Sequence, residues 1–143
     1  MSDPEELARR AAEAMWADDE ASRGLGMELV SVAPGRATLR MTVRADMTNG
    51  HGICHGGFTF ALADSAFAFA CNSHNVRTVA ASCDISYLAP TREGDVLVAD
   101  AVERQLAGRN GIYDVTVRVG DVAVAEFRGR SRAIGGALAD PSP

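Results

Sequence analysis

The feature that most limits how this chain can fold is an apolar run near its middle, directly after a glycine-rich loop. The stretch reads NGHGICHGGFTFALADSAFAFA, and within residues 58–71 only Thr59, Asp64 and Ser65 are polar. A helix over residues 57–72 would be about 24 Å long. Because such a helix is apolar nearly all round, it needs cover on most of its surface, which is more than one sheet provides. The run predicts a buried central helix with a second subunit as further cover.

The rest of the chain is predicted to form an N-terminal helix and six strands. The helix covers about residues 3–21, where Ser2 and Glu5 fit a capping box and Pro4 stands early in the helix. The predicted strands cover residues 27–33, 37–45, 77–88, 95–106, 112–119 and 122–133. Alternating apolar and polar residues in the second strand are typical of a sheet with one buried face. The predicted fold class is α+β, with the central helix covering an antiparallel sheet.

Length, charge and cysteine number limit the class of protein. A chain of 143 residues suits one domain, with a core over about residues 24–134 and a frayed tail at 135–143. A net charge of −5 argues against nucleic acid or an anionic membrane as the partner. The acidic N-terminus differs from a signal peptide, and the apolar run is shorter than the roughly 20 residues that span a bilayer. Three cysteines make no even disulfide framework, so we predict a cytoplasmic protein with reduced thiols.

The loop ahead of the central helix carries the sequence His55-Gly56-Gly57. We expect the backbone amides of Gly56, Gly57 and Phe58 to be among the unpaired N–H groups of the first helical turn. With the positive end of the helix dipole, such amides stabilise an anion or a developing oxyanion. The alternative is that the two glycines only permit a tight turn into the helix. The local sequence leaves both interpretations open.

Asp64 is the one acidic residue of the apolar run. A carboxylate in an apolar environment has a raised pKa, and groups of this kind are candidates for functional sites. Alternatively, a serine or a backbone amide caps Asp64, which then only fixes the packing. Asp64 follows Gly56 by eight residues, about 12 Å along one helix, so the two cannot act on one carbonyl within a single chain. Two antiparallel copies of the helix across a two-fold axis would bring them together.

The whole stretch resembles the signature of hot-dog-fold acyl-CoA thioesterases, specifically the phenylacetic acid degradation (PaaI-type) branch. The matching residues are an Asn-Gly pair beginning at Asn49, then His55-Gly56-Gly57, then Asp64. The later segments SYLAPTREGD and RNGIYDV also resemble that branch. The resemblance implies a hot-dog fold, in which a curved antiparallel sheet wraps around the central helix, in homodimers that pair into a homotetramer. It also implies that no cofactor is needed, since coenzyme A is part of the substrate.

The same resemblance implies the roles of the site residues. The Gly56 amide would polarise the thioester carbonyl, while Asp64 of the neighbouring subunit attacks that carbonyl or activates a water. Asn49 would hold the nucleophile or the water, and His55 would shape the loop. The implied substrates are aryl-acyl-CoA thioesters such as phenylacetyl-CoA or hydroxyphenylacetyl-CoA. Some relatives carry an assisting threonine one turn after the carboxylate, where this chain has Ala68.

Candidate contacts to the acyl group lie on the central helix and the strand after it. We expect Gly57, Phe58, Leu62 and Tyr87 to contact the substrate. Apolar side chains on such elements usually pack the core, so that alternative stays open for each of them. Glycine at position 57 would let a ligand approach the backbone closely.

Coenzyme A also brings phosphates, which require cationic side chains at the mouth of the site. The available arginines include Arg92, Arg104, Arg109 and Arg128. We expect Arg109, with Asn110 beside it in a predicted hairpin turn, to meet the nucleotide. The alternative for each arginine is a solvated surface charge.

The cysteines and histidines allow other interpretations. His51, Cys54 and His55 are metal-ligand types, but no second cluster stands at ligand spacing, so we predict no metal. Cys54 as a nucleophile has only a sequence neighbour in His55, which says nothing about spatial pairing. We expect Cys71 and Cys83 to pack in the interior and His74 to be exposed beside the helix dipole.

Two other functions remain as alternatives to thioester hydrolysis. A hot-dog dehydratase or hydratase needs a histidine and a carboxylate acting together, and His55 has no evident partner. A non-catalytic acyl-CoA-binding protein would gain nothing from a buried charge at Asp64. A serine hydrolase is not expected, because no nucleophile elbow or Ser-His-Asp order is visible.

Overall fold

The computed structural model describes residues 3–141 and contains helices and six strands in the predicted order. The helices are α1 (Pro4–Asp18), α2 (Glu20–Gly24), the short 3-10 helix η1 (Ala45–Met47) and the central α3 (Gly56–Cys71). The strands are β1 (Glu28–Ala33), β2 (Arg36–Thr42), β3 (Thr78–Tyr87), β4 (Val96–Ala107), β5 (Asn110–Val119) and β6 (Val122–Ala133). All six predicted strands are confirmed, with ends that differ by a few residues.

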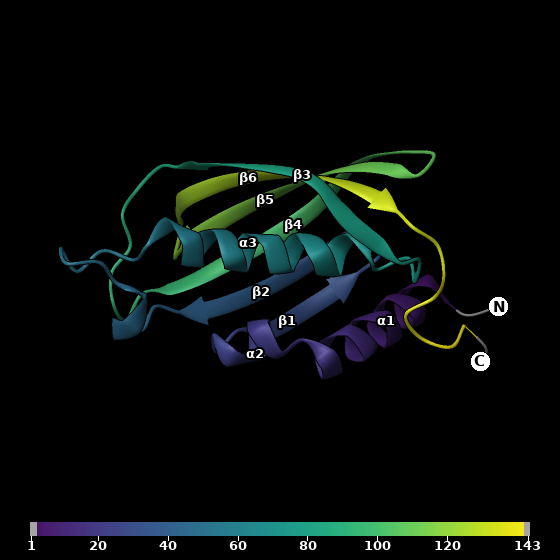
Figure 1. Ribbon diagram of the computed structural model, residues 1–143, viewed down its shortest axis with the longest axis horizontal. Coiled ribbons are helices and arrows are strands. Elements are labelled where there is room, and N and C mark those ends of the chain that lie inside the picture. Colours follow the sequence, from purple (N-terminus) through teal and green to yellow (C-terminus); the bar gives the residue numbers. More distant parts are fainter. Residues whose placement is uncertain (1–2, 142–143) are drawn as a thin grey trace.

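The strands form one antiparallel sheet in the order β1-β2-β4-β5-β6-β3. The sheet curves around α3, which runs along its inner face, while α1 and α2 lie beside β1 (Figure 1). The first and third strands along the chain are therefore the two edges of the sheet. This architecture confirms the predicted hot-dog fold with an additional N-terminal helix.

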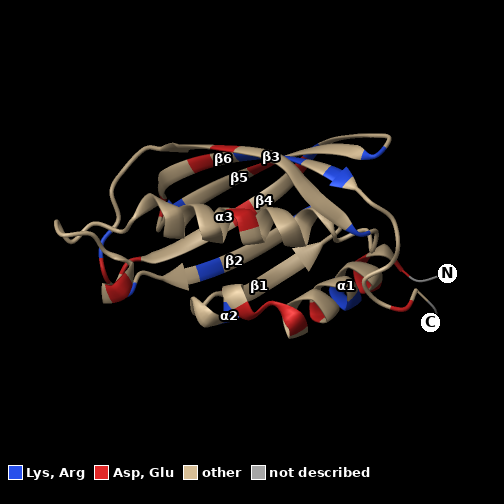
Figure 2. Cartoon of the chain, in the orientation of Figure 1, with Lys and Arg blue, Asp and Glu red and all other residues tan. Residues whose placement is uncertain are grey.

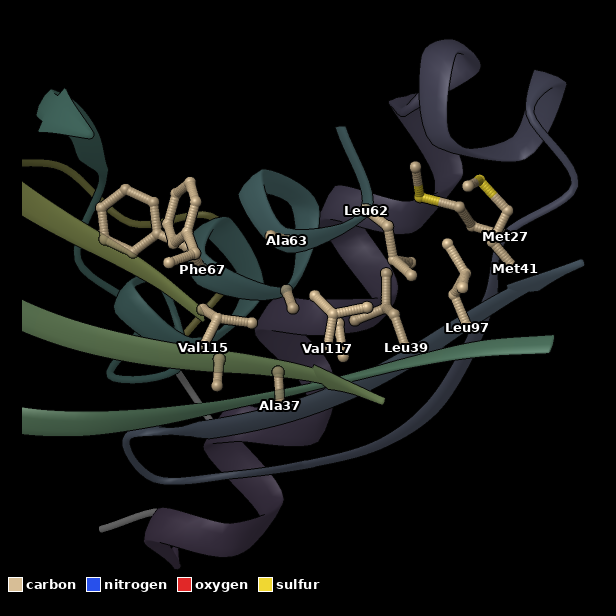
Figure 3. Packing of buried hydrophobic residues seen from close by; sticks show 14 of the residues in the cluster. Met27, Ala37, Leu39, Met41, Leu62, Ala63, Phe67, Leu97, Val115 and Val117 are labelled. Atoms are coloured by element: carbon tan, nitrogen blue, oxygen red, sulfur yellow. The ribbon is translucent and has the colours of Figure 1, made fainter. Parts of the chain in front are cut away.

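The core lies between α3 and the inner face of the sheet. Leu62, Ala63 and Phe67 point from the helix onto side chains of β2, β4 and β5 (Figure 3). Alternate residues of β2 and β5 are buried, which is the period expected of strands with one covered face. No helix within residues 3–141 is long and apolar enough to cross a membrane.

The N-terminal helix is shorter than predicted. It ends at Asp18, and Asp19 then caps a separate helix, α2, by accepting a hydrogen bond from the Ser22 amide at 3.0 Å. An aspartate readily caps a new helix because its side chain satisfies an unpaired first-turn amide. At the start of α1, Asp3 is the N-cap and accepts from the Glu5 amide at 3.4 Å. The predicted cap, Ser2, lies outside the described residues.

The C-terminal tail is more ordered than predicted up to Ala139. Asn75, which adopts a positive φ of 61°, accepts hydrogen bonds from the amides of Leu138 at 3.1 Å and Ala139 at 2.9 Å. Its amide group also donates to the Ala139 carbonyl at 2.9 Å. The expectation of fraying is therefore wrong for this part of the tail, and residues 142–143 lie outside the described chain.

Candidate active site

The N-terminus of α3 presents two free backbone amides. His55 is the N-cap residue, and Gly56 is the first residue of the helix. Within residues 3–141, the amides of Gly56 and Gly57 have no hydrogen-bond partner. The Phe58 amide does have one, because it donates to the His55 carbonyl at 3.0 Å. Two of the three predicted donors are thus available, and Phe58 is a correction.

Tyr87, at the end of β3, packs its ring tip closely over Gly56. Its hydroxyl donates to the Gly56 carbonyl at 2.8 Å. A methyl group added to Gly56 would lie 2.7 Å from Cζ of the Tyr87 ring, whereas one added to Gly57 would meet no atom within 4 Å. The close contact with Tyr87 is therefore specific to Gly56, and it fixes the start of α3 against the edge strand of the sheet.

A cavity of about 400 Å³ adjoins this helix end. The lining residues come from the loop before α3, the first turn of α3 and the segment after β3: Ile53, Cys54, Gly56, Thr59, Tyr87, Leu88, Ala89, Pro90, Thr91 and Val124. Of the predicted acyl contacts, Tyr87 lies in this lining. Phe58 packs partly buried against the core, and Leu62 is 0% exposed inside it (Figure 3). The structure therefore places Leu62 in the core and not beside this cavity.

Asn49 shapes the loop before α3. Its side-chain oxygen accepts hydrogen bonds from the amides of His51 at 2.9 Å and Ile53 at 3.1 Å. This turn geometry is typical of asparagine, whose side chain bonds to backbone amides a few residues on. The side-chain nitrogen of Asn49 has no partner among the described residues, so it is a free donor. His55 is exposed, and its backbone amide donates to the Met47 carbonyl at 2.8 Å.

Asp64 lies midway along α3 and is half-buried. Figure 2 shows it as the one acidic position on that helix. Burial raises its pKa, and no residue within 3–141 offers it a hydrogen bond or an ion pair. The alternative in which a serine or backbone amide caps Asp64 is therefore not found within the described subunit.

Two cysteines mark the side of α3 on which Asp64 lies. Burial raises the pKa of Cys83 on β3, and the nearby Asp64 carboxylate raises it further. Burial likewise raises the pKa of Cys71 to about 12, again with a contribution from Asp64. The Asp64 carboxylate therefore lies near Cys83 of β3, the strand at a free edge of the sheet. Cys71 is protonated at neutral pH and is unsuited to nucleophilic chemistry.

The candidate phosphate-binding arginines divide into two groups. Arg104 and Arg128 both bind the Asp114 carboxylate, at 2.9 and 2.7 Å. The side chains of Arg92 and Arg109 have no such partner within residues 3–141. Arg109 lies in the β4–β5 turn, at the opposite end of α3 from Gly56 (Figure 1). A single subunit therefore does not bring Arg109 and its neighbour Asn110 to the cavity beside Gly56.

Comparison with known proteins shows the family to which the chain belongs. Residues 51–126 match the family model described as the thioesterase superfamily. The chain is also 44% identical over 128 residues to the acyl-coenzyme A thioesterase PaaI of Escherichia coli, a match that covers 89% of this chain and 91% of the relative. The chain belongs to the thioesterase superfamily. This membership confirms the predicted resemblance and the prediction of a thioester hydrolase.

Solved structures agree with that assignment. The structure of the E. coli PaaI protein from the phenylacetic acid degradation operon matches with a TM-score of 0.92 and 42% identity, covering 94% of this chain and 99% of that one. A Streptococcus mutans protein bound to acetyl CoA matches with a TM-score of 0.74 and 25% identity, covering 78% and 90%. The hot-dog fold of this thioesterase is thus shared over most of its length.

The sequence did not indicate how the thioesterase loop is held in place. Tyr87 was expected to contact substrate, and its hydrogen bond to the Gly56 carbonyl became visible only in the structure. Cys54 and Thr59, whose Sγ and Oγ1 atoms lie 4.0 Å apart, line the same cavity. Residues 54 and 59 are too far apart in sequence, across a loop-to-helix junction, for their contact to follow from periodicity.

Proposed function

We propose that this acyl-CoA thioesterase hydrolyses aryl-acyl-CoA thioesters, of the phenylacetyl-CoA or hydroxyphenylacetyl-CoA type, to the free acid and coenzyme A. The observation that carries the proposal is the pair of free amides at Gly56 and Gly57 beside a cavity of about 400 Å³. Those donors match what a developing oxyanion requires. The E. coli relative, named as an acyl-coenzyme A thioesterase, supports the acyl-CoA substrate, and its operon supports the aryl acyl group.

In the proposed reaction the thioester oxygen accepts a hydrogen bond from the Gly56 amide, which stabilises the negative charge that develops there. Asp64 then acts in one of two ways. As a general base it takes a proton from a water, whose oxygen attacks the carbonyl carbon. As a nucleophile it attacks that carbon itself and forms an anhydride that water later hydrolyses. In both cases the carbon–sulfur bond breaks, and coenzyme A leaves as a thiolate that is then protonated. No cofactor is required.

The proposed site contains Asp64 of one subunit and Gly56 of its partner. Eight residues separate the two positions, about 12 Å along α3, which is too far for one bound carbonyl. Within residues 3–141, β3 is an edge strand that is paired only with β6, and most of its residues are exposed. Free edges are usually covered in native proteins. Antiparallel pairing of two β3 strands would cover both edges and set the α3 helices side by side.

Other residues have supporting roles in the proposal. The free side-chain nitrogen of Asn49 would donate to the nucleophile or water, and His55 would shape the loop at the carbonyl. Gly57, Phe58 and Tyr87 would contact the substrate near the thioester. Pairing of two dimers into a homotetramer, and a cytoplasmic location, remain predictions.

The coenzyme A phosphates need cations, and we assign them to Arg109 with Asn110. Arg109 has no carboxylate partner within residues 3–141, so its guanidinium is free to bind phosphate. In a dimer with antiparallel α3 helices, the C-terminal end of one helix approaches the N-terminal loop of the other. That arrangement supports a contribution of Arg109 to the partner's site.

Thiol release from a panel of aryl and aliphatic acyl-CoAs tests the proposal. We expect the aryl substrates to be hydrolysed fastest and Asp64→Asn to lower kcat by about 10²–10⁴-fold, the usual range for loss of a general acid or base. Asp121→Asn, at an exposed position in the β5–β6 turn, is the matched control and should retain full activity. Unchanged release by Asp64→Asn would refute the mechanism. Binding of acyl-CoA without release by the wild type would instead support a non-catalytic binding protein.

A further inference from the structure

A second cavity lies at the C-terminal end of α3, opposite to Gly56. Its volume is about 170 Å³. The lining residues come from the end of α3, the turn after it, the β4–β5 hairpin and the inner face of the sheet: Cys71, His74, Val76, Thr78, Leu106, Gly108, Arg109, Tyr113, Ser131 and Ala133. The cavity is smaller than the roughly 300–1,000 Å³ of drug-sized sites. It therefore suits a molecule built on a single ring.

Most polar side chains around this cavity are already bound to other groups. His74 Nε2 lies 2.8 Å from Glu103 Oε1, and the Tyr113 hydroxyl donates to the same oxygen at 2.8 Å. His74 is half-buried and paired with Glu103, which corrects the expectation that it is exposed beside the helix dipole. The Thr78 hydroxyl donates to the Val76 carbonyl at 2.8 Å. None of these groups needs a ligand to complete its hydrogen bonding.

Ser131 on β6 is the exception. It is 3% exposed, and its hydroxyl has no hydrogen-bond partner within residues 3–141. The hydroxyl lies over Gly111 on the neighbouring strand, where an added methyl group would come within 2.6 Å of Ser131 Oγ. Every fully buried side-chain nitrogen and oxygen among the described residues has a hydrogen-bond partner, so the Ser131 hydroxyl is not fully enclosed and is reached from the cavity. Because Ser131 lines the cavity, a polar group of a ligand can take the place of water as the partner of its hydroxyl.

Arg109 supplies the charge at this cavity. Its side chain is exposed and has no carboxylate partner within the described residues. The other walls are apolar or aromatic, from Val76, Leu106 and Ala133 and the Tyr113 ring. Aromatic rings pack favourably against one another in edge-to-face or offset arrangements. The lining therefore combines the Arg109 cation, a Ser131 hydroxyl with no protein partner within residues 3–141, and a wall suited to a ring.

We propose that this cavity binds a small monocyclic aryl carboxylate that carries a ring hydroxyl. The ring packs between Tyr113 and Leu106, the ring hydroxyl exchanges a hydrogen bond with Ser131, and the carboxylate pairs with Arg109. A charge-assisted bond to the guanidinium supplies the affinity, and the hydrogen bond to the Ser131 hydroxyl supplies the selectivity.

The proposed ligand belongs to the same chemical class as the acid that the proposed reaction releases. Occupancy of the cavity would neutralise Arg109, which the proposed function assigns to the coenzyme A phosphates. The released acid would then inhibit in competition with acyl-CoA. This consequence rests on the proposed function, whereas the binding of the acid does not.

Two ligands and two proteins are compared to isolate the proposed hydrogen bond between Ser131 and the ring hydroxyl. The probes are 4-hydroxyphenylacetate and phenylacetate, which differ only in the ring hydroxyl, titrated by ligand-observed NMR without any acyl-CoA. The proteins are the wild type and Ser131→Ala, which removes a hydroxyl that has no partner in the described chain. We expect Ser131→Ala to raise the Kd of 4-hydroxyphenylacetate by about 2–12-fold and to leave that of phenylacetate unchanged. Arg109→Gln should weaken both probes equally.

The controls separate this site from the candidate active site. Ser86→Ala, on an exposed position of β3, should leave both Kd values unchanged, and thermal melting should show that Ser131→Ala is folded. The proposal would be overturned if Ser131→Ala changed the Kd of both probes equally, or changed neither. It would also be overturned if hexanoate bound as tightly as 4-hydroxyphenylacetate. Thiol release with no acid binding would overturn this site alone. Acid binding with no thiol release would overturn the proposed function and leave this site standing.

Discussion

At the scale of single residues, the Asp64 carboxylate is expected to destabilise the folded subunit and to serve as the base of the proposed reaction. Burial raises its pKa, and within residues 3–141 nothing is bonded to its carboxylate. A carboxylate with a raised pKa is a better base than an exposed one, while its charged form is poorly solvated. Stability and activity are therefore expected to respond in opposite directions when this charge is removed.

The stability effect of Asp64 has a defined pH window. Because its folded pKa is raised above the unfolded value, its stability contribution is complete below the unfolded pKa and is lost as pH rises through the folded pKa. Above its folded pKa the wild type carries a poorly solvated charge at this position, whereas Asp64→Asn carries none at any pH. We expect the variant to raise Tm at pH 7 by about 2–4 °C, the shift that about 1 kcal/mol gives in a chain of this size. Calorimetry should show the difference vanishing below about pH 4. A lower Tm at pH 7 would mean that the partner subunit stabilises the carboxylate.

The adjacent glycines at the start of α3 provide a matched pair of variants. Gly56→Ala forces a methyl group to within 2.7 Å of the Tyr87 ring, whereas Gly57→Ala meets nothing within 4 Å. We expect Gly56→Ala to push the half-exposed Tyr87 ring aside and break its hydrogen bond to the Gly56 carbonyl, which lowers the free energy of unfolding by about 0.5–1.5 kcal/mol, and to lower kcat/KM as the amide shifts. Gly57→Ala should change stability little in denaturant titration. In a Tyr87→Ala background, Gly56→Ala should lose most of its effect on the free energy of unfolding. If the effects of the two substitutions simply add, the contact between residue 56 and the Tyr87 ring does not determine the cost.

At the scale of elements, the two edges of the sheet differ in how they are covered. β1 lies beside α1, whereas β3 has β6 on one side and no strand on the other within residues 3–141. Both strands expose a large apolar side chain, Val30 at 50% and Val79 at 46%. Only the open edge at β3 lies on the side of α3 where Asp64 is found, so the two edges are predicted to have different functions.

Lysine substitutions at these two valines distinguish the edges. Charged residues on an edge strand oppose pairing with another chain. We expect Val79→Lys to shift the protein toward monomers in analytical ultracentrifugation and to lower thiol release in parallel, because the proposed site needs two subunits. Val30→Lys should change neither. If Val79→Lys remains dimeric, or becomes monomeric with full activity, the proposed pairing through β3 is wrong.

At the scale of the whole molecule, the proposed site is assembled by two subunits that each supply half of it. Within one subunit, Gly56 and its cavity lie at one end of α3, and Asp64 lies two turns along the same helix. A two-fold axis then creates two equivalent sites from one sequence. This arrangement predicts that two different inactive subunits can restore one site between them.

Mixing Asp64→Asn subunits with Gly56→Ala subunits tests this assembly. A mixed dimer has one site with both wild-type groups and one site that lacks both. Random exchange makes half of the dimers mixed, so thiol release should recover to about a quarter of the wild-type value. The two variants kept separate give the baseline, and a single chain carrying both substitutions mixed with itself is the negative control. Recovery no greater than the sum of the separate variants would contradict a site shared between subunits.

The sequence predicted the fold and the family far better than the surroundings of each side chain. Helical and two-residue periodicities reveal which residues face the interior, so α3 and all six strands were predicted correctly. The break at Asp19 and the hydrogen bonds of Asn75 to the tail were missed. Capping and long-range side-chain contacts leave little periodic signal, because they depend on which distant segments meet.

The sequence by itself determined that one carboxylate, Asp64, stands in an apolar helix after a His-Gly-Gly loop, since these are facts of order and spacing. Only the tertiary structure decided that Phe58 donates its amide locally, that Leu62 packs in the core, and that Tyr87 closes on Gly56. It also decided that the Ser131 hydroxyl lines a second cavity with no protein hydrogen-bond partner within residues 3–141. Hydrogen bonding and burial depend on neighbours brought together by strand register and sheet curvature, and linear spacing does not encode those distances.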